Sequence, residues 1–473
     1  MQSCVENLTL FPAGTDMFEA LDDGKTACFL DSALVHDRLG RYSFIGVDPF
    51  MHFSSTGNRC CVETKGSEKR FITGDPLVEL NKLIKQYSTN GPSPFPLAHG
   101  GAVGYFSYDL GRLMEKLPDD TENDLNLPEC RFAFYDGGVV IDHLQECAYL
   151  VSTGLPLTGD AGKARARERM LHWKRRLSRP VSNNFSKTEQ NNYNRASGLQ
   201  ANFSREDYMQ AVEKSLEYIA AGDIYQVNIS QRFTTCLKTN PWELYRRLRY
   251  INPAPFASFL RFPEVTVAGS SPERFLKVEG DQVETRPIKG TRPRGRDPAE
   301  DAALKEELIA SEKDRAELLM IVDLERNDLG RACQTGSVQV PELFCLETYA
   351  TVYHLVSTVT GTLPAGKNVL DLLPVVFPGG SITGAPKIRS MEIIEELESV
   401  RRGIYTGSLG YIDFGGRADL NIVIRTFVIK NGRAYFQVGG GIVADSRPEL
   451  EYQETLDKAK ALLSALGVRE RGQ

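Results

Sequence analysis

The sequence predicts an α+β protein, in which mainly antiparallel sheets carry helices on their outer faces. Short stretches that alternate between apolar and polar residues fill the chain up to about residue 155, which is typical of antiparallel strands. Further along, helix and strand patterns are mixed without the regular alternation that parallel βαβ units require. Because 41% of the 473 residues are hydrophobic, with 23 Phe and 18 Tyr among the aromatic residues, the chain can fill a large core.

The expected elements of the amino-terminal part are short strands followed by one charged helix. The strands are expected near 27–30, 42–47, 52–54, 131–135, 138–141 and 148–152, and the helix over 160–177. Residues 178–203 hold six asparagines and few apolar residues, which indicates a linker. The chain therefore divides into an amino-terminal region (1–177), a linker (178–203) and a carboxy-terminal region (204–466).

Helix-start signals organise the carboxy-terminal region. Ser204 and Asp207 have the spacing of a capping box, and the helix that follows is expected to end near residue 221. Asp297 is a good N-cap for a helix that should run without a break to about residue 324. Ser446 and Glu449 form a second capping box, which should open a helix over 451–466.

Composition and charge exclude several classes of protein. A net charge of −6 disfavours nucleic acid as the main partner, and no apolar run is long enough to span a membrane. The first ten residues lack the basic segment of a secretory signal. Nine scattered cysteines without a C-x-x-C pair favour neither a disulfide framework nor a zinc site. We therefore expect a cytoplasmic protein.

Two expected helices each present a pair of carboxylates on one face. Asp314 and Glu317 are three residues apart on the first helix, and Glu451 and Glu454 are three apart on the second. If the two helices converge, these acids could hold a Mg²⁺ ion, which prefers oxygen ligands. The alternative is a set of surface acids paired within their own helices, for example Glu454 with Lys458.

Other segments suit an anionic ligand. Residues 284–296 carry five basic side chains, which form either a positive well for a carboxylate or phosphate or a solvated loop. Within it, Lys289 would become nucleophilic if partly buried, although most lysines lie on the surface. The glycine-rich stretch 377–387 before a helix could cradle a carboxylate but lacks the Walker A pattern. Glycines at 439–441 would allow a ligand to approach the backbone closely.

Two polar residues interrupt apolar strand patterns. Arg425 falls in a buried run and needs an anionic partner, which is either Asp419 or a substrate carboxylate. His354 also lies in an apolar stretch, where it is either a hydrogen-bonded core histidine or a residue of the site.

Several longer motifs then point to a family. The chain contains SPERF (271–275), TRPIKGT (285–291), DRAELLMIVDLERNDLGR (314–331), FPGGSITGAPKIRSMEII (377–394) and GGGIVADSRPELEYQET (439–455). Over residues 204–466 these motifs, in this order, resemble the chorismate-utilising enzymes, which include anthranilate, aminodeoxychorismate, isochorismate and salicylate synthases. The resemblance implies two large antiparallel sheets packed face to face with helices outside.

The resemblance also implies a reaction. Lys289 stands where anthranilate synthases and the isomerases usually have alanine, and a lysine there is typical of the members that aminate chorismate at C4. Lys289 would then form a covalent adduct at C2, ammonia would add at C4, and Glu273 would be the general acid. His354 matches an active-site histidine. The alternative within the family is anthranilate synthase component I.

The same resemblance implies ligands and a partner. A separate glutamine amidotransferase subunit would supply the ammonia, because this chain shows no amidotransferase domain. Mg²⁺ would be held directly by Glu317 and Glu454, and through water by Asp314 and Glu451. Chorismate would be bound by Arg425, Tyr411, Gly439, Gly440, Gly441, Thr383 and Lys387.

Overall fold

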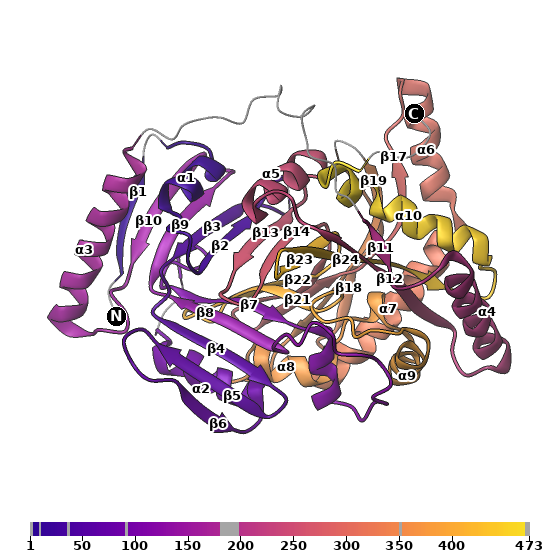
Figure 1. Ribbon diagram of the computed structural model, residues 1–473, viewed down its shortest axis with the longest axis horizontal. Coiled ribbons are helices and arrows are strands. Elements are labelled where there is room, and N and C mark those ends of the chain that lie inside the picture. Colours follow the sequence, from indigo (N-terminus) through magenta and orange to yellow (C-terminus); the bar gives the residue numbers. More distant parts are fainter. Residues whose placement is uncertain are drawn as a thin grey trace.

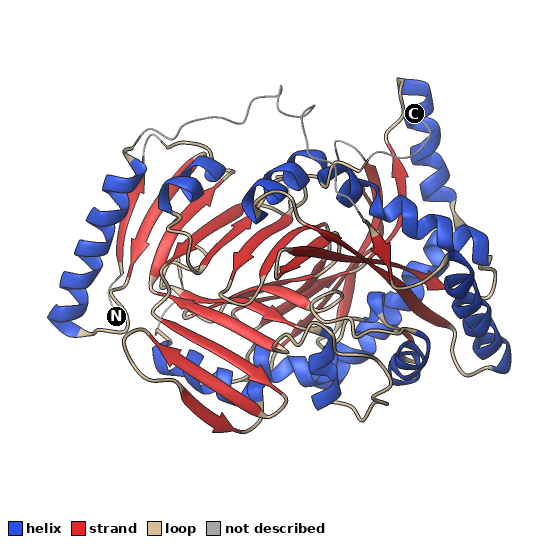
Figure 2. Cartoon of the chain, viewed as in Figure 1, coloured by secondary structure: helices blue, strands red, loops and turns tan. Residues whose placement is uncertain are grey.

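Two large antiparallel sheets, packed face to face, form the centre of the protein (Figures 1 and 2). The computed structural model describes residues 3–8, 11–35, 38–89, 93–179, 198–349 and 352–468. Each sheet contains twelve strands within these residues. The α+β class and the face-to-face sheets expected from the sequence are thereby confirmed.

The first sheet combines strands from the whole length of the chain. In spatial order its strands are β1 (Cys4–Leu8), β10 (Cys147–Ser152), β9 (Gly137–Asp142), β3 (Tyr42–Val47), β2 (Ala27–Asp31), β13 (Phe256–Arg261), β14 (Thr266–Ser271), β23 (Thr426–Lys430), β24 (Arg433–Ile442), β12 (Gln226–Cys236) and β11 (Gln200–Ala201), with β20 (Gly384–Ala385) paired to β12.

The second sheet is built in the same mixed way. Its order is β17 (Ile288–Pro293), β19 (Val352–Thr362), β16 (Gln282–Arg286), β15 (Arg274–Glu279), β22 (Ala418–Ile422), β21 (Ser408–Asp413), β7 (Gly101–Phe106), β8 (Cys130–Tyr135), β4 (Met51–Thr56), β5 (Arg59–Thr64) and β6 (Arg70–Thr73), with β18 (Gln339–Thr348) paired to β19.

The amino- and carboxy-terminal regions therefore form one body. Strand β2 pairs with β13 in the first sheet, and β7 pairs with β21 in the second. One hydrophobic cluster lies between the sheets and includes Phe44 and Val267 of the first and Tyr105 and Leu409 of the second. The segment 178–203 therefore connects two parts of the sequence that share the same sheets, and these parts do not have separate hydrophobic cores. Of the expected linker, residues 180–197 lie outside the described residues.

Helices cover the outer faces of both sheets (Figure 2). Within the described part of the chain, no helix combines the length and apolar character needed to cross a bilayer. The helices on the first sheet are α1 (Gly14–Leu21), α3 (Gly159–Leu177), α4 (Arg205–Ala221), α5 (Pro241–Ile251) and α10 (Pro448–Ala465), and α9 (Lys387–Leu397) packs against β12 of the same sheet. The helices on the second sheet are α2 (Pro76–Tyr87), α6 (Pro298–Ala310), α7 (Glu312–Ala332) and α8 (Val369–Val376). Two short 3₁₀ helices are η1 (Tyr108–Leu113) and η3 (Gly380–Ile382).

Three local expectations were wrong, each for an identifiable reason. The helix expected to continue from Asp297 breaks at Ser311, whose hydroxyl accepts the Asp314 N–H at 3.2 Å and so caps a second helix, α7. Ser446 does not cap α10. Its hydroxyl instead donates to the Glu451 carboxylate at 2.6 Å. Arg425 lies between β22 and β23 rather than within a strand, at a left-handed backbone position (φ 53°).

Candidate active site

Lys289 lies on β17, and its side-chain amine reaches Gly441 of β24 in the other sheet. A Cβ added to Gly441 would lie 3.5 Å from Lys289 Nζ and 3.0 Å from Gln226 Nε2. A side chain at this position would therefore occupy the space between the lysine amine and the buried amide. The glycine run thus leaves room beside the lysine amine for a ligand.

Glu273 occupies the turn that leads into β15 and is only 6% exposed. The hydroxyl of Ser381 donates a hydrogen bond to Glu273 Oε1 at 2.7 Å. Burial raises the pKa of Glu273 to about 7, although this hydrogen bond and the positive charge of Lys289 act in the opposite direction. A carboxyl group with this pKa can hold and release a proton near neutral pH, as a general acid must.

The acids of α7 and α10 approach each other across the site. Burial raises the pKa of Glu317, and the nearby charges of Asp314 and Glu454 raise it further. A Cβ added to Gly440 of β24 would lie 3.2 Å from Oε2 of Glu451 and 3.5 Å from Oε1 of Glu454, both on α10. Glu317 of α7 therefore lies near Glu454 of α10, and the α10 pair lies next to the glycine run.

Each of these acids already has a polar partner. Within the described residues, no three acidic, histidine or cysteine side chains are arranged to hold one metal ion. As they stand, the four acids do not form a ready metal site, and Mg²⁺ binding stays a prediction. The contacts are Arg292 Nη2 to Asp314 at 3.1 Å, Lys313 Nζ to Glu317 at 4.0 Å, Ser446 Oγ to Glu451 at 2.6 Å and Lys458 Nζ to Glu454 at 2.6 Å.

The Arg425 guanidinium is available to an anion. Asp419, the partner that the sequence left open, accepts two hydrogen bonds at 2.9 Å from Arg274 instead. Among the residues that the structure describes, no carboxylate lies within ion-pair distance of Arg425. Burial lowers the pKa of Arg425, while the charges of Tyr405 and Glu454 raise it. A substrate carboxylate would relieve the desolvation of this buried cation.

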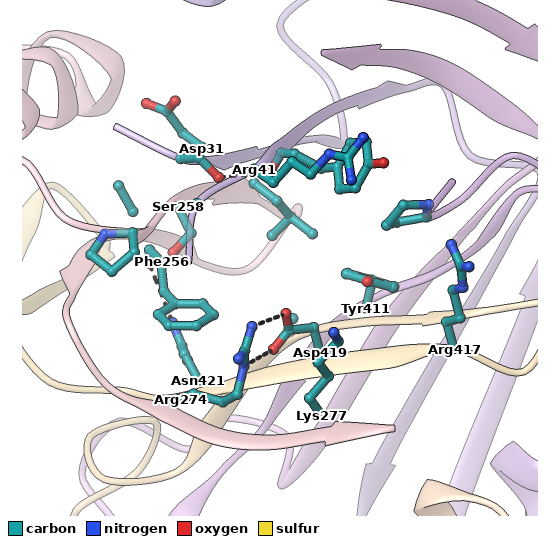
Figure 3. Close-up of a pocket in the computed structure, with 18 of the residues that line it drawn as sticks. Asp31, Arg41, Phe256, Ser258, Arg274, Lys277, Tyr411, Arg417, Asp419 and Asn421 are labelled. Atoms are coloured by element: carbon teal, nitrogen blue, oxygen red, sulfur yellow. Dashed lines mark hydrogen bonds and ion pairs between the residues drawn. The ribbon is translucent and has the colours of Figure 1, made fainter. Parts of the chain in front are cut away.

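The predicted substrate contact Tyr411 lies elsewhere. It faces a separate cavity of about 410 Å³ between the two sheets, where Arg274, Arg417 and Asp419 are its neighbours (Figure 3). Its assignment to the site is therefore corrected. The phenol near Arg425 is that of Tyr405, which stands six residues earlier in the chain and was not among the expected site residues.

Thr383 and Lys387 make hydrogen bonds to the glycine-rich loop, and their contact with a substrate stays a prediction. The Thr383 hydroxyl is fully buried and donates to the carbonyl of Gly379 at 3.0 Å. The Lys387 amine forms an ion pair with Asp328 and donates to the Val376 carbonyl at 3.0 Å. Both side chains thereby fix the backbone of the glycine-rich loop that carries Ser381.

His354 lies beside the lysine segment in a mostly apolar environment. Its Nδ1 is 2.9 Å from the hydroxyl of Thr291, and its ring packs edge-on against Tyr349 with centroids 5.4 Å apart. Burial lowers its pKa to about 4, and the nearby charge of Arg425 lowers it further. The imidazole is therefore neutral at pH 7.

Gln226 is a site residue that sequence reasoning missed. Its side chain is fully buried beside Gly441, and neither its nitrogen nor its oxygen has a hydrogen-bond partner among the described residues. A buried amide without a partner costs about 1–3 kcal/mol, so this group favours a polar ligand in the site. Its role depends on burial without a hydrogen-bond partner, which is a property of the folded site.

Comparison with known proteins gives a consistent family assignment. The family model for chorismate binding enzymes matches residues 30–464. The chain belongs to the chorismate-binding enzymes. It is 41% identical over 454 residues to aminodeoxychorismate synthase component 1 of Escherichia coli (strain K12), covering 95% of each chain. It is 44% identical over 448 residues to anthranilate synthase component 1 of Thermus thermophilus, covering 94% of this chain and 93% of that one.

Solved structures show the same architecture. Anthranilate synthase component I from Streptococcus pneumoniae TIGR4 superposes with a TM-score of 0.79 at 32% identity, over 91% of this chain and 94% of that one. The menaquinone-specific isochorismate synthase MenF of Escherichia coli superposes with a TM-score of 0.72 at 18% identity, over 98% and 94%. The second comparison concerns the fold alone.

Proposed function

We propose that this protein aminates chorismate at C4 and releases 4-amino-4-deoxychorismate, the precursor of p-aminobenzoate in folate synthesis. The observation that carries the proposal is the position of Lys289, whose amine lies beside Gly441 in the same site as Glu273. Relatives named aminodeoxychorismate synthase component 1 and covering nearly the whole chain support it.

The proposed reaction uses the lysine twice. The neutral amine of Lys289 attacks C2 of chorismate, the ring double bonds shift, and the C4 hydroxyl leaves as water with a proton from Glu273. Ammonia then attacks C4, the double bonds shift back, and the C2–nitrogen bond to Lys289 breaks. The proton that ammonia loses restores Glu273, so atoms and charge balance over one cycle.

Binding of the substrate dianion follows from the charges of the site. One carboxylate would pair with Arg425, and the phenol of Tyr405 would donate to it. Mg²⁺ belongs to the proposal as a partner for the second carboxylate, held by Glu317 and Glu454. Before Glu454 could bind Mg²⁺, Lys458 would have to release the Glu454 carboxylate, with which it forms an ion pair.

The source of ammonia is the second half of the proposal. The relatives are named component 1, which implies a separate partner component. We propose that this partner is a glutamine amidotransferase, because hydrolysis of a glutamine amide supplies ammonia where it is consumed.

Anthranilate synthesis is the competing activity, because relatives named anthranilate synthase component 1 are equally similar. The two reactions differ in the ring carbon that receives the amine, C4 in one and C2 in the other, and in the fate of the enolpyruvyl group. Amination at C4 keeps the enolpyruvyl group, whereas anthranilate formation releases pyruvate. The presence of a lysine at position 289, whose amine lies in the site, favours the first.

The deciding experiment is mass spectrometry of the product made from chorismate, ammonium and Mg²⁺. We expect an amine that retains the enolpyruvyl group, with no pyruvate. Lys289→Ala should lose this product, whereas Lys238→Ala, at an exposed lysine remote from the site, should make it at the normal rate. Anthranilate together with pyruvate would refute the proposal.

A further inference from the structure

A buried ion pair lies between two parts of the candidate site. Glu398 caps the end of α9, Arg402 follows four residues later, and their side chains are 2% and 1% exposed. The Arg402 guanidinium donates to both oxygens of the Glu398 carboxylate, at 3.0 Å and 2.7 Å. Because replacing a buried ion pair by apolar side chains is often neutral for stability, stability alone does not explain why two charges are buried here.

Arg402 uses its remaining donors on the backbone of two other segments. Its Nη1 donates to the Ile382 carbonyl at 2.9 Å, and its Nη2 donates to the Asn228 carbonyl of β12 at 2.6 Å. The Asn228 side-chain amide also donates to the Ile382 carbonyl, at 3.1 Å. A buried backbone carbonyl needs hydrogen-bond partners, and at Ile382 these two side chains supply them. Arg402 thereby fixes the glycine-rich loop at Ile382.

This anchor lies one residue from the contact that orients the proposed general acid. Ser381 directly precedes Ile382, and its hydroxyl donates to Glu273 Oε1 at 2.7 Å. A hydroxyl donor forms such a bond only at about 2.5–3.0 Å, so a small shift of the loop would break it. The orientation of the Glu273 carboxyl group therefore depends on the anchor that Arg402 provides.

The same guanidinium lies beside the phenol that is proposed to meet the substrate. The Arg402 Cζ atom is 5.9 Å from the centre of the Tyr405 ring, and the Tyr405 N–H donates to the Arg402 carbonyl at 3.2 Å. Burial raises the pKa of Tyr405 to about 12, and the positive charge of Arg402 opposes this rise. Both the place of the phenol and its strength as a donor thus depend on Arg402.

Arginine is the side chain that suits this set of contacts. Its planar guanidinium presents five N–H groups in fixed directions, whereas a lysine ammonium is a compact charge with three. All three nitrogens of Arg402 are engaged, and its Cζ atom lies 4.8 Å from the centre of the Tyr108 ring in η1. A lysine would keep the charge but could not bind Glu398, Ile382 and Asn228 together.

We propose that Arg402 is a positioning residue that holds the loop carrying Ser381 and the turn carrying Tyr405 in a fixed relation to each other. It thereby places the Glu273 carboxyl group and the Tyr405 phenol for one substrate molecule. The inference rests on the proposed function, in which Glu273 is the general acid and Tyr405 donates to a substrate carboxylate. Arg402, whose donors are all used within the protein, acts through these residues.

The test is a pair of double-mutant cycles, one read in kcat and one in KM. Arg402→Lys should lower kcat about tenfold, because Ser381 no longer orients Glu273, and raise KM for chorismate about tenfold, because Tyr405 is displaced. Ser381→Ala should lower kcat about tenfold in the wild type but less than about twofold in the lysine variant. Tyr405→Phe should raise KM about tenfold in the wild type and less than about twofold in the lysine variant.

Arg169→Lys is the matched control, at a mostly buried arginine of α3 that lies 3.0 Å from the Asp136 carboxylate. Both lysine variants should lower the melting temperature, but Arg169→Lys should keep the wild-type kcat and KM. With a merely structural role, the losses of Arg402→Lys would multiply with those of Ser381→Ala and Tyr405→Phe, and this result would overturn the inference. Wild-type kcat and KM in Arg402→Lys would do the same.

A second variant covers the case in which Arg402→Lys does not fold. Asn228→Ala removes only the other hydrogen bond to the Ile382 carbonyl. It should lower kcat about threefold or more, leave KM unchanged, and add less than about twofold to the loss in Ser381→Ala. A normal kcat, or losses that multiply, would contradict the inference. If the product proves to be anthranilate, the same cycles are measured on that product, so the proposed function and this inference fail separately.

Discussion

Replacing Glu273 by glutamine should make the protein inactive and, at alkaline pH, more stable. The carboxyl group is buried at 6% exposure and its pKa is about 7, against an ordinary value of 4.5. Glutamine has nearly the same shape, and its oxygen can still accept the hydrogen bond from Ser381. The substitution therefore removes the ionisation and leaves the packing in place.

The size of the effect follows from the shift in pKa. Because the folded-state pKa of Glu273 is raised, the proton stabilises the fold fully below about pH 4.5, and this contribution is lost as the pH rises through about 7. A shift from 4.5 to about 7 corresponds to about 3 kcal/mol. Near pH 8 the variant should exceed the wild type by up to this amount, and near pH 4.5 the difference should vanish.

Urea unfolding at several pH values tests this expectation. Glu217→Gln, at an exposed ion pair on α4, is the control and should change the free energy of unfolding by less than about 0.5 kcal/mol at every pH. A Glu273→Gln variant that is less stable than the wild type near pH 8 would refute the reasoning. So would a stability difference that does not change with pH.

Three further outcomes are expected at the site. Tyr405→Phe should raise KM for chorismate about tenfold, whereas Tyr411→Phe, in the cavity between the sheets, should leave KM unchanged; equal effects would contradict the correction made above. Gly441→Ala should lower kcat by about 10- to 100-fold in steady-state assays, since its methyl group would fill the space beside the lysine amine; normal kcat would show that this space is unused. Glu454→Gln should weaken Mg²⁺ binding in calorimetry at least about tenfold, and unchanged affinity would place the ion elsewhere.

The sequence was most informative where residues close together in the chain share one element. The two acid pairs could be placed on helical faces because their spacing alone determines the face, and the pair on α10 does lie beside Gly440. That α7 and α10 approach each other could not be derived from spacing, since it depends on how the two helices pack on different sheets. For Lys289 and Glu273, only the resemblance to a family indicated that they belong together.

The errors arose where tertiary contacts choose between local alternatives. Tyr405 and Tyr411 are six residues apart, and which phenol reaches Arg425 depends on the fold, because Tyr405 lies in the turn before β21 whereas Tyr411 lies within this strand. Ser311 could have continued a helix or capped one, and in the structure it caps α7. Gln226 gave no signal because the absence of hydrogen-bond partners is a property of the folded site.

The mixing of early and late strands in both sheets has a consequence for synthesis of the protein. Strand β7 is complete at Phe106, but β21, which pairs with it, begins only at Ser408. At about 5–20 residues per second, roughly 15–60 s pass on the ribosome before this partner exists. During that time the β7 edge is open to other chains. The amino-terminal region made alone should therefore self-associate, and the growing chain should depend on chaperones until its last strands emerge.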